Sequence, residues 1–204
     1  MRSADAIAPP AWPQALVPWA MVAACAVVAA GLLGLRGAAA WTGLALTCIA
    51  LGAPLVQGAA APGSDPRLQT ACRMLLSGAL GMLIGLSFDH PSGLVPLLSL
   101  CRSGSPGWLD GAWSSLAQMP YACVAMIAAC QCGEWMHVRR ARCRRRDRLA
   151  AHVAMLAGMA LAHAPAAQLG GGLPGPWPAA VFLIWMVAGM AAGLLLVSWT
   201  FREA

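Results

Sequence analysis

The chain contains six apolar segments, and each is about long enough to cross a bilayer. Crossing about 30 Å of hydrocarbon takes roughly 20 helical residues at about 1.5 Å per residue. Hydrophobic residues make up 60% of the 204-residue sequence and charged residues 10%, with a mean hydropathy of +0.69. Soluble domains carry roughly 45 to 50% apolar residues, so the sequence predicts an all-α, polytopic transmembrane helix bundle. The predicted spans are 18–35, 39–61, 70–88, 112–132, 149–169 and 179–200.

Helix-breaking residues separate several of these segments. Positions 61–65 read APGSD and positions 170–178 read GGGLPGPWP, which are typical of loops. We therefore expect one transmembrane domain, 18–200, between a proline-rich leader, 1–17, and a short tail, 201–204.

A cluster of arginines fixes the expected orientation. The chain has no lysine, and seven of its thirteen basic residues fall between positions 139 and 148. Loops rich in Arg and Lys stay on the cytoplasmic side, so the loop 137–148 is predicted to be cytoplasmic, the loop 89–111 external, and both termini cytoplasmic. Basic residues that are all arginine, with abundant alanine and glycine, are typical of GC-rich bacteria and favour a bacterial inner membrane. The cluster consists of Arg139, Arg140, Arg142, Arg144, Arg145, Arg146 and Arg148.

A second interpretation of the N-terminal region is a signal peptide. The stretch 19–35 would be its apolar core and Ala38, Ala39 and Ala40 its cleavage region. This alternative leaves five spans and an external N-terminus. A long, proline-rich leader with one arginine is a poor match to the basic start of a signal peptide, so six spans are favoured.

Sulfur and imidazole side chains recur at helical spacing on two predicted spans. Residues three or four apart share one helix face, and thioether and thiolate sulfur favour Cu(I), with imidazole as a further ligand. This pattern predicts a soft-metal site, with copper the expected ion and haem a second possibility. Ordinary bundle packing is the competing interpretation and the more favoured one, because methionine fills irregular gaps beside glycine. The two stripes are Met119, Cys123, Met126 and Cys130 on one span and His152, Met155, Met159 and His163 on the next.

Ionisable residues at the external ends of spans are further candidates. Asp89 and His90 close the third predicted span, and His163 lies toward the external end of the fifth. Such groups are costly near lipid and often mark ion paths. We expect these three residues to form an external entry, with the methionines as a path and Cys130 as the inner exit. Plain solvation of a helix end is the competing interpretation.

The sequence lacks the motifs of common enzyme classes. It contains no phosphate-binding Walker loop, dinucleotide fingerprint, HExxH or GxSxG. No aromatic residues interleave the clustered arginines, so nucleic-acid binding is not expected. Two functions remain: a soft-metal transporter or metal-site assembly factor, and a non-catalytic membrane subunit whose arginine loop docks a partner or anionic lipid. A membrane-embedded enzyme is not favoured.

Overall fold

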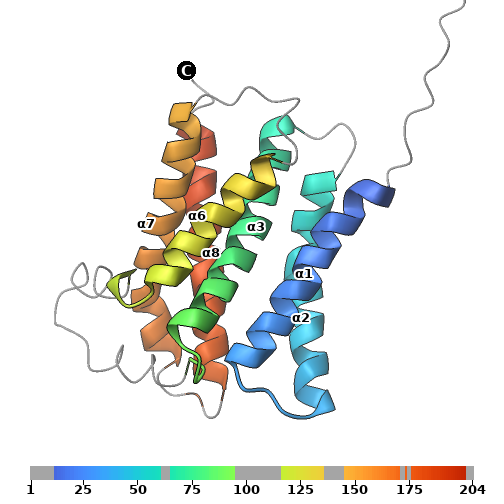
Figure 1. Cartoon of the computed structure of the whole chain (residues 1–204), viewed down its shortest axis with the longest axis vertical. Coiled ribbons are helices and arrows are strands. Elements are labelled where there is room, and N and C mark those ends of the chain that lie inside the picture. The colour runs from blue at the N-terminus through green and yellow to red at the C-terminus, as the bar shows by residue number, and fades with distance from the viewer. Residues whose placement is uncertain are drawn as a thin grey trace, which may run out of the picture.

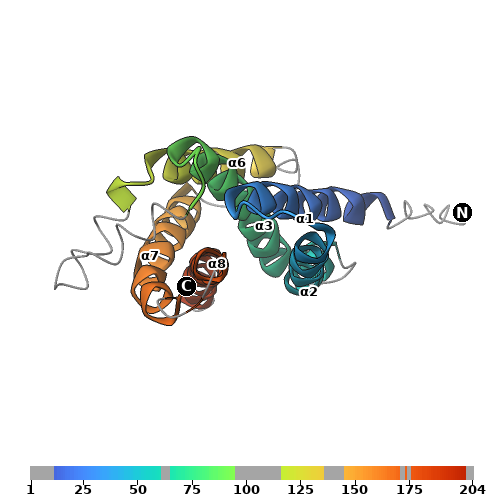
Figure 2. The ribbon, with the colours of Figure 1, turned by 90° about the horizontal axis from the view of Figure 1, so that it is seen from below.

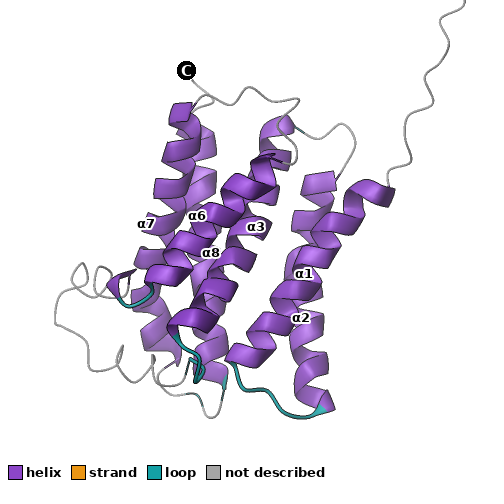
Figure 3. Ribbon diagram, in the orientation of Figure 1, coloured by secondary structure: helices purple, strands orange, loops and turns teal. Residues whose placement is uncertain are grey.

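The described residues of the computed structural model form six α-helices and no strand (Figure 3). The described residues are 12–60, 65–94, 116–135, 145–170, 173 and 176–200; of these, the side chains of 12–15, 133–135, 145–148, 163–170 and 198–200 are not described. The prediction of an all-helical bundle is confirmed. The helices are α1 (Trp12–Leu32), α2 (Ala38–Ala60), α3 (Pro66–Asp89), α6 (Pro120–Trp135), α7 (Arg145–Gly170) and α8 (Trp177–Thr200).

Successive helices alternate in direction (Figure 1). The start of α1 and the end of α8 lie at the same end of the bundle, together with the start of α7. The ends of α3 and α7 lie at the opposite end. This alternation matches what antiparallel neighbours joined by loops require.

Helix α3 is the centre of the bundle. It packs against α1, α2, α6 and α8, whereas α7 packs mainly on α8. Viewed from below, α3 lies between the α1–α2 pair and the α7–α8 pair, with α6 along its side (Figure 2). Residues of α3 are accordingly the most buried, and any site inside the bundle must be built around this helix.

Three described helices are long and apolar enough to cross a bilayer: α2, α3 and the segment Trp177–Val197 of α8. The other helices contain shorter apolar stretches, Leu16–Leu32, Pro120–Cys132 and Leu149–Ala162. Large apolar side chains such as Leu46, Val124 and Leu196 are more than 60% exposed. Exposed apolar surface of this extent is unfavourable in water and ordinary in lipid, which fits a membrane protein.

Glycines hold the helix pairs close together. A Cβ added to Gly158 of α7 would collide with the carbonyl oxygen of Gly189 on α8, and one added to Gly193 would collide with that of Ala154. On the other side of the bundle, a Cβ on Gly85 of α3 would meet the backbone of α6 at Ala122. Small residues four apart allow this backbone-to-backbone approach in membrane helices.

Polar side chains of α3 complete helix ends. Asp65 precedes α3 and accepts a hydrogen bond from the backbone N–H of Arg67 at 2.9 Å, as a helix N-cap does. The guanidinium of Arg73 donates from Nε and Nη2 to the carbonyl oxygen of Ala59, at 3.2 and 2.9 Å. The carbonyl oxygens in the last turn of a helix have no donor within that helix, and the charged guanidinium of Arg73 supplies one for α2.

The predicted and observed helix limits differ most for the fourth segment. The prediction placed its start at 112, whereas α6 begins at Pro120 after a break at Gln118 and Met119. Proline at the first position of a helix is favourable because its missing N–H would lack a partner there anyway. The first helix also begins earlier than predicted, since Pro18 lies inside α1.

Candidate functional site

The two predicted stripes of sulfur and imidazole face the interior of the bundle. Met126, Cys130 and Met155 are fully buried, and Met119 and Met159 are 2% exposed. His152 is buried at 5% exposure, and Cys123 is half-buried against the same core. His163 lies in α7, but its side chain is outside the described part.

The stripes meet at α3. The closest helix pairs among the described residues are α3 with α6 and α7 with α8, so the two stripes do not lie on a tightly packed α6–α7 pair. They converge instead on Gly78, near the middle of α3. An ideal Cβ at Gly78 would lie 2.5 Å from Met155 Cε, 3.1 Å from Cys130 Sγ and 3.2 Å from Met190 Cε. Side chains from α6, α7 and α8 therefore end within 3.2 Å of a single point on α3.

The thiol of Cys130 has a defined orientation. Its Sγ donates a hydrogen bond of 3.4 Å to the carbonyl oxygen of Met74, one turn before Gly78 on α3. The hydroxyl of Ser77 donates to the same carbonyl at 3.2 Å. This contact holds Cys130 against α3, and its sulfur lies 3.1 Å from the point where a Cβ of residue 78 would stand.

Methionine dominates the largest buried side chains of this core. Seven of the eleven largest fully buried side chains are methionine, although leucine is abundant on the exposed faces of the same helices. Eight methionines and Cys130 belong to one continuous core cluster. Beyond the predicted stripes, this cluster includes Met74 and Met82 of α3 and Met186 and Met190 of α8.

Asp89 has a structural role that the sequence did not reveal. Its Oδ1 and Oδ2 accept hydrogen bonds from the backbone N–H groups of Tyr121 and Ala122, at 3.1 and 2.8 Å. These amides are the second and third of α6, the ones that an N-cap side chain normally satisfies. Met119, which precedes Pro120, has no oxygen in its side chain to do so. The last residue of α3 thus caps α6 from outside the helix, and its negative charge favours the helix N-terminus.

His90 is held by a tight turn at the end of α3. Its carbonyl accepts from Gly93 N, and Leu94 N donates to the carbonyl of Leu32 at 3.2 Å. Gly93 has a φ of 93°, a conformation that side chains disfavour. The Nε2 atom of His90 is buried and has no hydrogen-bond partner among the described residues. The expected meeting of Asp89, His90 and His163 stays a prediction, although the ends of α3 and α7 share one end of the bundle (Figure 1).

Histidine, cysteine and carboxylate side chains alone do not form a metal site in the described part of the chain. Its residues include no group of three or more His, Cys, Asp or Glu side chains placed to hold a metal ion.

Most of the arginine cluster is outside the described residues. Arg139, Arg140, Arg142 and Arg144 belong to the undescribed segment between α6 and α7. Arg145 is the first residue of α7, so Arg146 and Arg148 fall in its first turn, although their side chains are not described.

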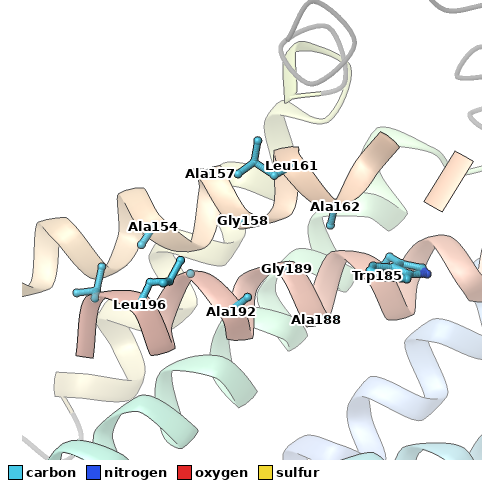
Figure 4. Close-up of a pocket in the computed structure, with 12 residues that line it drawn as sticks. Ala154, Ala157, Gly158, Leu161, Ala162, Trp185, Ala188, Gly189, Ala192 and Leu196 are labelled. Atoms are coloured by element: carbon cyan, nitrogen blue, oxygen red, sulfur yellow. The ribbon is translucent and has the colours of Figure 1, made fainter. Parts of the chain in front are cut away.

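A groove of about 620 Å³ runs along the contact between α7 and α8 (Figure 4). Alanines and glycines form most of its wall, with Leu161, Trp185 and Leu196 among the larger side chains. None of its twelve lining residues carries an ionisable or sulfur-containing side chain. The groove has the chemistry of a lipid-facing surface, and it does not include the sulfur side chains near Gly78.

The sequence predicts that most of these buried sulfur side chains share helix faces, but it does not show that Met190 and Gly78 lie beside Cys130 and Met155. Helical spacing identifies a shared face on one helix, whereas the register between α3 and α8 depends on packing. Comparison with protein-family models, with curated proteins and with solved structures gave no match.

Proposed function

We propose that this protein is an integral membrane protein that binds a soft metal ion, copper(I), for transport or for delivery to another metal site. The observation that carries the proposal is the meeting of Cys130, Met155 and Met190 around Gly78. Thioether and thiolate sulfur are the protein ligands that favour Cu(I).

The charge balance also favours a monovalent ion. One thiolate and one Cu(I) together carry no net charge, and thioether ligands add none. A neutral complex is far less costly in an apolar interior than an unbalanced divalent ion. The described core around Gly78 offers no carboxylate for such an ion, since Asp89 binds the start of α6.

The remaining candidates extend the proposal to a path. Asp89, His90 and His163 would form the external entry. Met159, Met119, Met126 and Cys123 line the core between that end and the centre. In this proposal the start of α7 lies at the cytoplasmic end of the bundle, because the positive-inside rule places the arginine loop there. The membrane is a bacterial inner membrane.

Elemental analysis of the detergent-purified protein tests this function. Protein expressed with added copper is expected to retain about one copper per chain, because a buried sulfur site releases Cu(I) slowly. Substituting Met159 and Met126 together by leucine keeps the core volume nearly unchanged and should lower the retained copper. An ultraviolet-visible spectrum of the same sample would show a Soret band if the core held haem instead. Protein that retains no copper, including protein that holds haem instead, would contradict the proposal.

A second candidate is a non-catalytic membrane subunit that docks anionic lipid or a cytoplasmic partner. One observation favours it: α7 begins at Arg145, so three arginines and Asp147 fall in its first turn. The positive end of the helix dipole adds to their charge, and an anionic phosphate would offset both.

Lipid mass spectrometry of the purified protein tests this second candidate. We expect anionic phospholipid to remain with the wild-type protein. Replacing the seven clustered arginines by glutamine should remove most of it, whereas Arg36→Gln, in the exposed turn between α1 and α2, should not. Equal amounts of anionic lipid in all three proteins would refute the docking role.

A further inference from the structure

We infer that Cys130, Met155 and Met190 are the ligands of one copper(I) ion, in a site that exists because residue 78 is glycine. This inference rests on the proposed function and assigns its central site. Met190 is a ligand that the sequence did not predict. Three helices, α6, α7 and α8, each supply one sulfur side chain, and α3 supplies the wall.

The absence of a side chain at position 78 is the first support. The point where a Cβ would stand lies 2.5 Å from Met155 Cε, 3.1 Å from Cys130 Sγ and 3.2 Å from Met190 Cε. All three are tips of side chains, and both methionines have three rotatable bonds. The methyl groups of Met155 and Met190 cover this face of Gly78, and rotation of the two side chains would move these methyl groups away and turn sulfur toward Gly78 while the helices stay in place.

The other glycines of α3 differ in this respect. Added Cβ atoms at Gly81 and Gly85 would meet the backbone of α6, at Ala125 and Ala122. Those glycines bring two helices into contact. Gly78 instead faces the ends of sulfur side chains, so it does not bring two helix backbones into contact.

The state of Cys130 supplies the chemistry. Its thiol donates to the Met74 carbonyl at 3.4 Å, so the proton is present in the metal-free protein. Binding of Cu(I) replaces this proton, which passes to the solvent, and the thiolate bonds the ion without any change of oxidation state. The two thioethers complete a three-coordinate sulfur site of zero net charge. Cys130, Met155 and Met190 are fully buried, so the site lies away from bulk water.

Matched methionine variants test the assignment. Copper(I) is supplied to the purified full-length protein as its bicinchoninate complex, and the affinity is obtained by competition. We expect Met155→Leu and Met190→Leu each to lower the affinity at least tenfold, and Cys130→Ser to lower it further. Met82→Leu and Met186→Leu serve as controls, since both side chains are as deeply buried in the same core but are not among the three atoms nearest to Gly78. Elution volume and helical circular dichroism verify that each variant keeps the fold.

The pH dependence of the copper(I) affinity is a second measurement, and a purely structural role of the three residues would not change it. Because one thiol proton is released, the wild-type affinity should rise about tenfold per pH unit, and this dependence should be absent in Cys130→Ser. Unchanged affinity in a Met155→Leu/Met190→Leu double variant, or equal losses in the two controls, would overturn the assignment while leaving copper binding in place. A wild-type protein that takes no copper from bicinchoninate would overturn the proposed function as well.

Discussion

Replacing Gly158 by alanine is expected to weaken the α7–α8 pair by about 1 to 3 kcal/mol, the usual cost of forcing a methyl group into a filled interior. The new Cβ would overlap the Gly189 carbonyl oxygen and lie 2.7 Å from its carbonyl carbon. Because both atoms are backbone, no rotation of a side chain relieves the overlap. The two helices must separate, and contacts at Gly193 and Ala162 weaken with them. Unfolding of the detergent-solubilised protein by increasing fractions of sodium dodecyl sulfate measures this loss.

Gly43→Ala is the matched control for Gly158. A Cβ at Gly43, also inside a helix, would meet nothing within 4 Å. Alanine favours helix over glycine by up to about 1 kcal/mol, so this variant should be as stable as the wild type or slightly more stable. If the Gly158→Ala protein were as stable as the Gly43→Ala protein, α7 and α8 would not be in close backbone contact at Gly158.

Gly78→Ala should have the opposite profile, a nearly normal fold with little copper binding. The three atoms nearest to the added methyl group are the tips of Met155, Cys130 and Met190, and the flexible methionine tips can move aside at small cost. The same methyl group fills the space in which the three sulfur atoms would surround the ion. We expect at least a tenfold loss of copper(I) affinity, measured with bicinchoninate, and an unfolding transition close to that of the wild type.

Gly43→Ala is also the control for Gly78→Ala. It makes the same substitution at a glycine where the added Cβ has no neighbouring atom within 4 Å. It should bind copper(I) as the wild type does. A Gly78→Ala protein with undiminished affinity would show that the ion does not lie beside α3. A Gly78→Ala protein that fails to fold would show that this glycine, like Gly158, serves close packing, and it would contradict the assignment of the space to an ion.

The helices themselves were predictable because hydropathy alone determines them. Six apolar segments bounded by Pro, Gly and Asp predict six helices, and the part of the chain that the structure describes forms six. The predicted first and last residues of a helix were less accurate where a residue of another helix determines where that helix begins. Pro120 is a local signal for the start of α6, but the Asp89 carboxylate that caps this start lies more than thirty residues earlier, and no pattern local to 112–120 identifies it.

The sequence predicts which side chains of a single helix face the candidate site. It does not predict which side chains of different helices meet there. Spacings of three and four placed Met126, Cys130 and Met155 on buried faces, and the structure buries all three. The identity of the partner across the bundle depends on how far each helix slides along α3. That register is set by glycine contacts such as Gly81 against Ala125 and Gly158 against Gly189. The glycines are visible in the sequence, but their pairing is not.

X-ray absorption at the copper edge of the copper(I)-loaded wild-type protein tests the central claim most directly, because it identifies the atoms bound to the ion. Three sulfur neighbours and no nitrogen or oxygen neighbour are expected if Cys130, Met155 and Met190 hold it. A first shell of nitrogen and oxygen would contradict the account and move the ion to histidine or carboxylate ligands.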